Sequence, residues 1–224
     1  MKKKYELTSE SIDLDGLTLY RIRALKDFGN VKRGDLGGFI EKEANLSHVG
    51  NCWVYDEAKV FPDASVFDDD EVFDPAQFFG NACVYGNARV FDNAQVFDHA
   101  QVFGNACVYG NARVFDNAQV FDHVEVFGKA CVYGNARVFA GVEVFGKARV
   151  FDFAEVFGNA RVFDGVQVFG KARVFDDAEV FGNARVFDNA WVYGNARVFD
   201  DAWVCGLGSV SNNVRICGDT NINK

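Results

Sequence analysis

The chain is poor in several residue types that enzymes and membrane proteins commonly use. Its 224 residues include three histidines, two prolines and one methionine. No apolar run is long enough to span a bilayer, and the lysines of the first ten residues have no apolar run behind them, so neither a membrane segment nor a signal peptide is expected. The formal charge of −9 leaves no basic excess for nonspecific binding to nucleic acid. We therefore expect a cytoplasmic protein that contacts neither membranes nor nucleic acid directly.

Cysteine pairing is also missing. Three cysteines recur at one repeat position, 24 residues apart, and are interpreted as leftovers of a duplicated block. The spacing predicts neither a disulfide nor a metal site, no cofactor is expected, and reduced thiols suit the cytoplasm. The six cysteines are Cys52, Cys83, Cys107, Cys131, Cys205 and Cys217.

One six-residue unit, Ala-x-Val-Phe-(Gly/Asp)-Asn, dominates the sequence. From Val54 onward, 26 of 29 positions spaced six apart are Val, and the residue two before each is Ala in 21 of 29. An aromatic residue follows each such position from Tyr55 to Phe199. Because alternate strand residues face opposite sides, Ala and Val predict an apolar inner face, and the Gly/Asp-Asn pair predicts a corner. A unit this small must stack on copies of itself, as in a solenoid of short parallel strands.

Charge indicates how many sides the solenoid has. With three hexads per coil, residues 18 apart become neighbours at about 4.8 Å, and opposite charges then meet. A four-sided coil would instead stack arginine on arginine. We therefore predict an all-β fold: a single-stranded, three-sided, left-handed parallel β-helix of about 9 to 10 coils. The two alternating columns are Glu143, Arg161, Glu179 and Arg197, and Arg137, Glu155 and Arg173.

The N-terminal part does not repeat. Residues 1–45 are predicted to form a small β cap and residues 46–224 the β-helix. Residues 11–22 alternate apolar and polar side chains around Asp15-Gly16, a strong hairpin signal. Between Leu46 and Val54 the spacing is eight instead of six, so two residues are inserted where the cap joins the first coil.

A family resemblance rests on the cap and the units that follow it. The phrase LYRIRALKDFGNVKRGDLGGFIEKEANLS (residues 19–47), then GNCWVY and the GNARV units, resembles the YdcK-type β-solenoid proteins of bacteria and their phages. The resemblance covers nearly the whole chain and implies a left-handed β-helix. Many members are labelled acyltransferases by analogy of fold, and fold analogy is a weak guide to chemistry.

Two histidines are the candidates for a general base if the protein is an acyltransferase. Hexapeptide acyltransferases, which share the hexad, use a histidine as general base at a cleft between subunits. In this chain His99 and His123 stand where Asn normally makes the corner, and no loop interrupts the hexads. A general base needs a positioned partner and a pocket, so we interpret both as corner substitutions and keep catalysis as the alternative.

One irregular coil holds the candidates for a metal site. Both prolines lie near residues 61–79, and Asp70 occupies an inward Ala position. An unpaired buried carboxylate is costly, so the coil must bulge or Asp70 must be solvated or paired. A plain bulge is the favoured interpretation, and the weaker alternative is a cation site with oxygen ligands. Its candidate ligands are Asp68, Asp69, Asp70, Glu71 and Asp74.

The outward aromatic residues favour a binding role. They predict three apolar columns, which Trp191, Tyr193 and Trp203 thicken near the C-terminal end into a candidate binding stripe. We predict a noncatalytic scaffold or protein-binding module of possible phage origin, and a homodimer through the C-terminal coils, because the hexads continue to the end without a second cap. The alternatives are an acyltransferase and an acidic DNA mimic or anti-defence protein that uses the regular corner aspartates.

Overall fold

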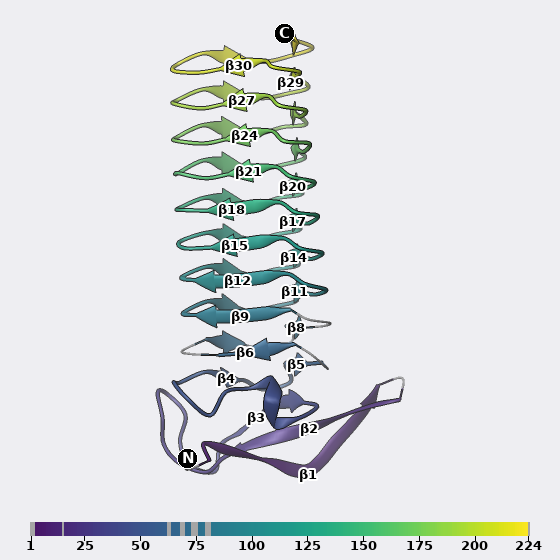
Figure 1. Ribbon diagram of the computed structural model, residues 1–224, viewed down its shortest axis with the longest axis vertical. Coiled ribbons are helices and arrows are strands. Elements are labelled where there is room, and N and C mark those ends of the chain that lie inside the picture. Colours follow the sequence, from purple (N-terminus) through teal and green to yellow (C-terminus); the bar gives the residue numbers. More distant parts are fainter. Residues whose placement is uncertain are drawn as a thin grey trace.

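The computed structural model is a rod of stacked coils with a β-sheet cap at the N-terminal end (Figure 1). It describes residues 3–14, 16–61, 64–67, 70–72, 76–78 and 82–223, apart from the side chains of Glu71 and Tyr85. Within these residues the single helical element is the 3-10 turn η1 (Glu43–Asn45). No helix in the described part of the chain is long and apolar enough to cross a membrane.

In the described part of the chain, to which the strand counts below refer, each hexad forms one short strand. Strands that are three hexads apart along the chain are neighbours in the same sheet, and this arrangement gives three sheets. Sheet 1 has 13 strands: β1 (Tyr5–Leu14), β2 (Leu17–Ala24), β3 (Leu36–Ile40), β5 (Lys59–Val60), β8 (Gln77–Phe78), β11 (Gln95–Val96), β14 (Arg113–Val114), β17 (Cys131–Val132), β20 (Arg149–Val150), β23 (Gln167–Val168), β26 (Arg185–Val186), β29 (Trp203–Cys205) and β32 (Asn221–Asn223). Sheet 2 has ten: β4 (Trp53–Val54), β7 (Glu71–Val72), β10 (Arg89–Val90), β13 (Cys107–Val108), β16 (Glu125–Val126), β19 (Glu143–Val144), β22 (Arg161–Val162), β25 (Glu179–Val180), β28 (Arg197–Val198) and β31 (Arg215–Ile216). Sheet 3 has nine: β6 (Ser65–Val66), β9 (Cys83–Gly86), β12 (Gln101–Gly104), β15 (Gln119–Phe121), β18 (Arg137–Phe139), β21 (Glu155–Val156), β24 (Arg173–Val174), β27 (Trp191–Val192) and β30 (Ser209–Val210).

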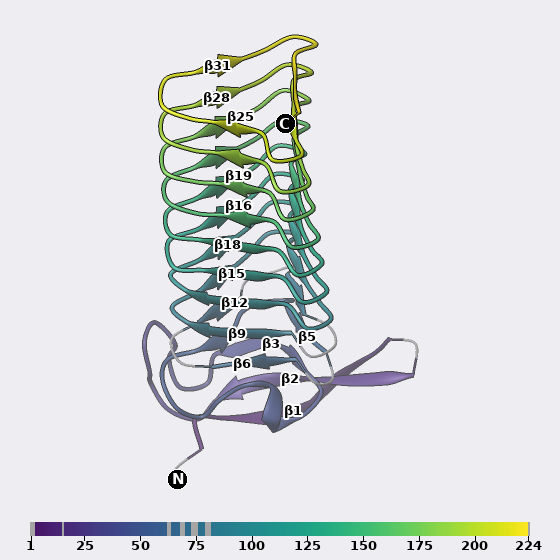
Figure 2. The ribbon, with the colours of Figure 1, turned by 45° about the horizontal axis from the view of Figure 1, so that its top comes forward.

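The strand register confirms three sides. Residues 18 apart pair in parallel, for example Glu143 with Arg161 and Arg161 with Glu179. With the C-terminal end turned toward the reader, the coils wind in the left-handed sense (Figure 2). The predicted fold class is therefore confirmed, and the alternation of charge was the correct guide to the number of sides.

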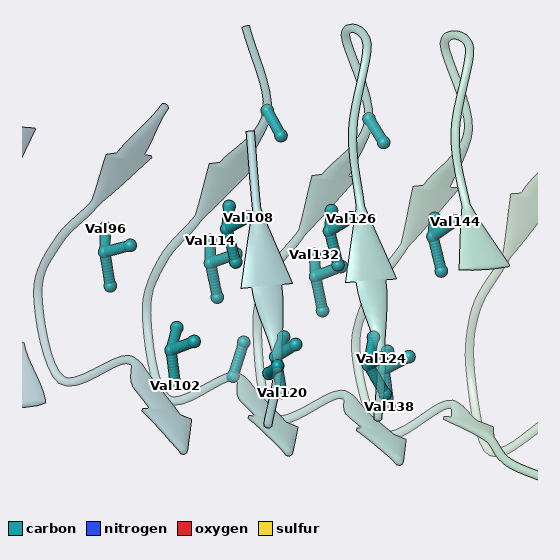
Figure 3. Close-up of a cluster of buried hydrophobic side chains, with 14 of the residues drawn as sticks. Val96, Val102, Val108, Val114, Val120, Val124, Val126, Val132, Val138 and Val144 are labelled. Carbon is teal, nitrogen blue, oxygen red and sulfur yellow. The ribbon is translucent and has the colours of Figure 1, made fainter. Parts of the chain in front are cut away.

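The interior is a continuous apolar column. The inward Val and Ala residues of the solenoid are fully buried from Val84 to Val204, because each coil covers its neighbours. Burying a valine side chain contributes about 1.5 kcal/mol or more. In Figure 3 valines from all three sheets point into the same central space: Val96, Val114 and Val132 from sheet 1, Val108, Val126 and Val144 from sheet 2, and Val102, Val120 and Val138 from sheet 3.

The corners explain why Gly and Asp alternate. Aspartates at the first corner position have positive φ, such as 59° at Asp116 and 59° at Asp152, a conformation that Asp tolerates better than most residues. The Asp116 carboxylate accepts a hydrogen bond of 3.0 Å from the Gly134 amide one coil further on, and Asp152 does the same for Gly170 at 3.2 Å. Aspartate thus satisfies a corner amide that the strand ladder leaves out.

The outward aromatic rings form three ladders, one along each corner. Successive rings from residue 91 to residue 199 stack nearly parallel, with centroids 4.7 to 5.0 Å apart. Their faces cover one another and their edges point to solvent, so the rings are half-buried. The ladders contribute to stability by stacking as well as presenting apolar surface.

The cap continues sheet 1. β1 and β2 pair antiparallel with Leu14 opposite Leu17, which confirms the predicted hairpin. β3 then pairs in parallel with β5, so the cap closes the first coil through backbone hydrogen bonds. The bridge between Leu46 and Val66 spans 20 residues, as the predicted two-residue insertion requires. The division of the chain at residue 45 stays a prediction.

Candidate binding surface

Trp203 lies on the outward side of sheet 1. Its indole is 40% exposed and meets the Phe187 ring edge-on, with centroids 6.1 Å apart and an angle of 75° between the rings. The Arg185 guanidinium lies 5.2 Å from the indole centroid, a favourable cation–π distance. A ring held on two sides in this way is a preorganised aromatic anchor.

Trp191 and Tyr193 lie on sheet 3. Trp191 is 44% exposed and contacts Phe175 edge-on at 6.2 Å, while Tyr193 continues the ladder on Phe175 at 4.9 Å. Hydrogen bonding with Ser211, and then with Ser209, lowers the pKa of the Tyr193 phenol. Arg173 packs against Trp191 as Arg185 does against Trp203.

The structure therefore separates the candidate binding residues that the sequence joined. We expected one stripe through Trp191, Tyr193 and Trp203, but they lie on two different sheets. The reason is the three-sided coil: residues 191 and 203 differ by 12 positions, which is two thirds of a coil and not a whole number of coils.

The three faces differ in how their charges are balanced. On sheet 2 Arg161 pairs with Glu143 at 3.0 Å and with Glu179 at 3.8 Å. On sheet 3 the Glu155 carboxylate forms ion pairs with the guanidinium groups of Arg173 at 3.0 Å and Arg137 at 3.5 Å. Arg197 extends the sheet 2 column to Glu179 at 2.8 Å. These two faces neutralise much of their own charge.

From β11 to β29, sheet 1 has cations at outward strand positions and no carboxylate among them. Arg113, Arg149 and Arg185 are exposed, and none forms an ion pair among the residues that the structure describes. In Figure 1 the solenoid strands of this sheet follow one another up the right-hand edge. We call the outward side of β11 to β29 the basic face. The sequence analysis missed this face. Its signal in the sequence is the column of residues 18 apart, in which Arg113, Arg149 and Arg185 alternate with uncharged residues.

Cys131 lies in the centre of the basic face, one coil from Arg113 and one from Arg149. Burial raises the pKa of its thiol, although both guanidinium groups act in the opposite direction. Burial likewise raises the pKa of the neighbouring Tyr133, again against Arg149. At neutral pH the thiol and the phenol are therefore uncharged, and the face keeps its positive charge.

A depression adjoins Trp203. Its volume is about 400 Å³, and its polar rim combines one cation with two carboxylates. A second, smaller depression of about 270 Å³ lies on the same face beside Arg113 and Gln95. Both are open surface hollows that suit a protruding side chain of a partner. The larger one is lined by Asn183, Arg185, Asp201, Trp203, Asp219, Thr220 and Asn221.

The two candidate catalytic histidines lie apart. His99 is in the corner that follows β11 of sheet 1, and His123 is in the corner that follows β15 of sheet 3. The His99 amide donates to the Asp116 carbonyl at 2.8 Å, a corner hydrogen bond that Asn makes elsewhere. His123 lines a depression of about 480 Å³ together with Gly141 and Asn159.

Asp70 is fully buried, as its inward position predicts, and it is paired. Its carboxylate accepts a hydrogen bond of 2.9 Å from the Ala88 amide one coil further on. Asp68, Asp69 and Asp74 lie outside the described residues, as does the side chain of Glu71. Within the described part of the chain, no cluster of three or more His, Cys, Asp or Glu side chains could hold a metal ion.

The cap contributes a buried amino group that no sequence pattern indicated. Lys4 is fully buried, and its Nζ donates to the Cys52 carbonyl at 2.9 Å and contacts the Cys52 Sγ at 3.2 Å. Burial raises the pKa of the Cys52 thiol, with Lys4 opposing. The contact ties the cap to the first coil, so its role in the fold is structural.

Comparison with known proteins identifies the repeat. The family model of the YdcK β-solenoid repeat matches residues 82–98, 100–114, 108–122 and 190–206. A curated relative, described as "Uncharacterized acetyltransferase YdcK" of Escherichia coli (strain K12), is 40% identical over 63 residues. That match covers 25% of this chain and 19% of the relative, so the chain aligns with about a fifth of the relative's length.

Proposed function

This chain is a YdcK-type β-solenoid repeat protein, and from that premise we propose that it is a noncatalytic module that docks another protein on the basic face. The balance of charge carries the proposal. On sheets 2 and 3, four arginines form ion pairs with glutamates of their own face: Arg137, Arg161, Arg173 and Arg197. On sheet 1, by contrast, Arg113, Arg149 and Arg185 have no carboxylate beside them in the column from β11 to β29. Unpaired charge on one face of a rigid rod favours a partner of complementary charge.

Trp203 supplies the anchor for such a partner. Tryptophan and arginine carry a large share of the energy of protein interfaces when a partner excludes water from them. Arg185 and Trp203 are in contact and share the wall of the 400 Å³ depression. The partner's side chain would fill this hollow, and the arginines further along the face would set its direction.

Loss of the anchor is expected to reduce partner recovery. With the full chain immobilised in an extract of its source cell, Trp203→Ala and Arg185→Gln should each lower the amount of a specific co-purifying protein at least about tenfold. Quantitative mass spectrometry of the bound fraction measures this. The matched control is Glu179→Ala, which alters the internally paired face of sheet 2 and should leave recovery unchanged.

Equal recovery with all three variants would reject docking on sheet 1. The partner could also be a second copy, as the expected homodimer requires. Light scattering on the purified chain distinguishes the two cases, because a dimer that Trp203→Ala dissociates would make the chain its own partner.

Acyl transfer is a second candidate function, favoured by one observation. His123 lines a depression together with Asp122 and Asn159, and the relative from Escherichia coli has an acetyltransferase description. We nevertheless expect His99→Ala and His123→Ala to leave partner binding and any acetyl transfer from a thioester donor unchanged. A clear loss of transfer in His123→Ala, with unchanged circular dichroism, would favour the enzyme over the binding module.

A further inference from the structure

The basic face has a regular spacing along the axis of the rod. Its outward residues alternate between cations and uncharged side chains, and neighbouring coils are 4.7 to 5.0 Å apart, as the adjacent ring ladder shows. The arginines are two coils apart, which is about 9.6 Å. In order the column is Gln95, Arg113, Cys131, Arg149, Gln167, Arg185 and Trp203.

This spacing matches one extended backbone conformation and not another. A polyproline II segment has three residues per turn and rises about 3.1 Å per residue, so every third side chain faces the same way at about 9.3 Å. In a β-strand the side chains on one face recur at about 6.7 Å, which does not match the arginine spacing. Most carboxylates of a peptide in that conformation would lie between two arginines and not opposite one. A polyproline II segment with an acid at every third position would meet Arg113, Arg149 and Arg185 in turn.

The corners on both sides of the face favour a narrow partner. They carry eight exposed or half-exposed aspartates and three exposed lysines, Lys129, Lys147 and Lys171. The rims are therefore acidic on balance and would repel the phosphates of a broad polyanion such as duplex DNA. A single extended peptide over the arginine column would lie between these rims. The aspartates are Asp92, Asp164, Asp200 and Asp201 before the strands, and Asp98, Asp116, Asp152 and Asp188 after them.

Aromatic surface next to the arginines suits the same partner. The ladder from Phe97 to Phe187 runs parallel to the arginine column, and Trp203 stands at its end beside the depression. Aromatic-lined grooves are the usual docking sites for proline-rich segments, because the preformed polyproline II helix loses little entropy on binding.

We propose that the basic face binds an acidic polyproline II segment that runs along the rod, with a carboxylate at every third residue opposite Arg113, Arg149 and Arg185. The inference rests on the proposed function and names the chemistry of the partner. The proline or other apolar residues between the acids contact the ring edges and the hollow at Trp203.

The test measures the binding of two fluorescent peptides of equal composition to the full chain. The increase in fluorescence anisotropy of each peptide gives its dissociation constant. One peptide has three Glu-Pro-Pro units, and the other has the same nine residues with its three glutamates adjacent. The spaced peptide is expected to bind about tenfold more tightly, because three surface ion pairs of up to about fivefold each form together only in that register. Arg149→Gln should weaken its binding about fivefold.

An isosteric variant removes the unpaired charge without disturbing the fold. Gln167 is the neighbour of both Arg149 and Arg185, so Gln167→Glu reproduces the Arg-Glu-Arg column that sheet 2 already contains. It should abolish the preference for the spaced peptide. The matched control is Gln119→Glu on sheet 3, which adds the same charge on another face and should leave the preference intact.

Equal binding of the two peptides overturns the inference, as does tighter binding of duplex DNA or inorganic polyphosphate than of the spaced peptide. The recovery experiment separates the two proposals. If the spaced peptide shows no preference while Trp203→Ala still lowers partner recovery, the docking face stands and the partner's chemistry is wrong. If neither variant nor peptide has an effect, the docking face itself is wrong.

Discussion

Val132→Asp is expected to destabilise the coils in the middle of the rod. Val132 is fully buried in the apolar column between Val114 and Val150, and in Figure 3 it points into the same central space as Val114 and Val126. An unpaired carboxylate there should cost at least about 4 kcal/mol, a large part of the stability of an ordinary domain. Urea unfolding followed by circular dichroism measures the loss, and a chain too unstable to purify folded is the same result in its extreme form.

The control places the same charge outside the column. Gln119→Asp on sheet 3 changes a half-buried outward residue and should alter the free energy of unfolding by less than about 0.5 kcal/mol. Because each coil contacts its immediate neighbours, hydrogen exchange in Val132→Asp should increase most in the coils around residue 132. Similar unfolding midpoints for the two variants would contradict an apolar interior.

Gly134→Ala is expected to destabilise the corner through contact with the next coil. Gly134 has a φ of +71°, and a Cβ there would come within 2.8 Å of the Asp152 amide nitrogen. The left-handed conformation costs about 1 to 2 kcal/mol for a residue with a Cβ. The steric contact should add about 1 to 3 kcal/mol, because the stacked backbone has little freedom to move.

Gly218→Ala separates these two costs. Gly218 has a similar φ of +64°, but a Cβ there would meet no atom within 4 Å. It should therefore show the conformational cost alone, and the difference between the variants in the free energy of unfolding measures the steric part. Equal losses would mean that stacking does not constrain the corner.

Periodicity was sufficient to predict the solenoid because each hexad buries its Ala and Val side chains in the same way, against the neighbouring coils. Ala88 and Val90 are buried in the way that the alternation predicted, and the signs of Glu143 and Arg161 predicted which residues stack. The cap hairpin was also predictable, since Asp15-Gly16 is a local signal. The basic face could have been predicted from the same 18-residue spacing. It was missed because the sequence analysis searched for alternating opposite charges, and the neighbours of Arg113, Arg149 and Arg185 in their column are uncharged.

The sequence by itself determined the repeat, the three-sided stacking and the inward and outward residues, because these depend on contacts between neighbouring coils that recur along the chain. Tertiary structure alone decided the burial of Lys4 against Cys52, 48 residues away, and the hydrogen bond that pairs Asp70 with Ala88. It also separated Trp191 from Trp203 by placing them on different sheets. The physical reason is that a periodic pattern encodes contacts between nearest neighbours, whereas a single buried polar group depends on partners that one particular arrangement of the chain brings together.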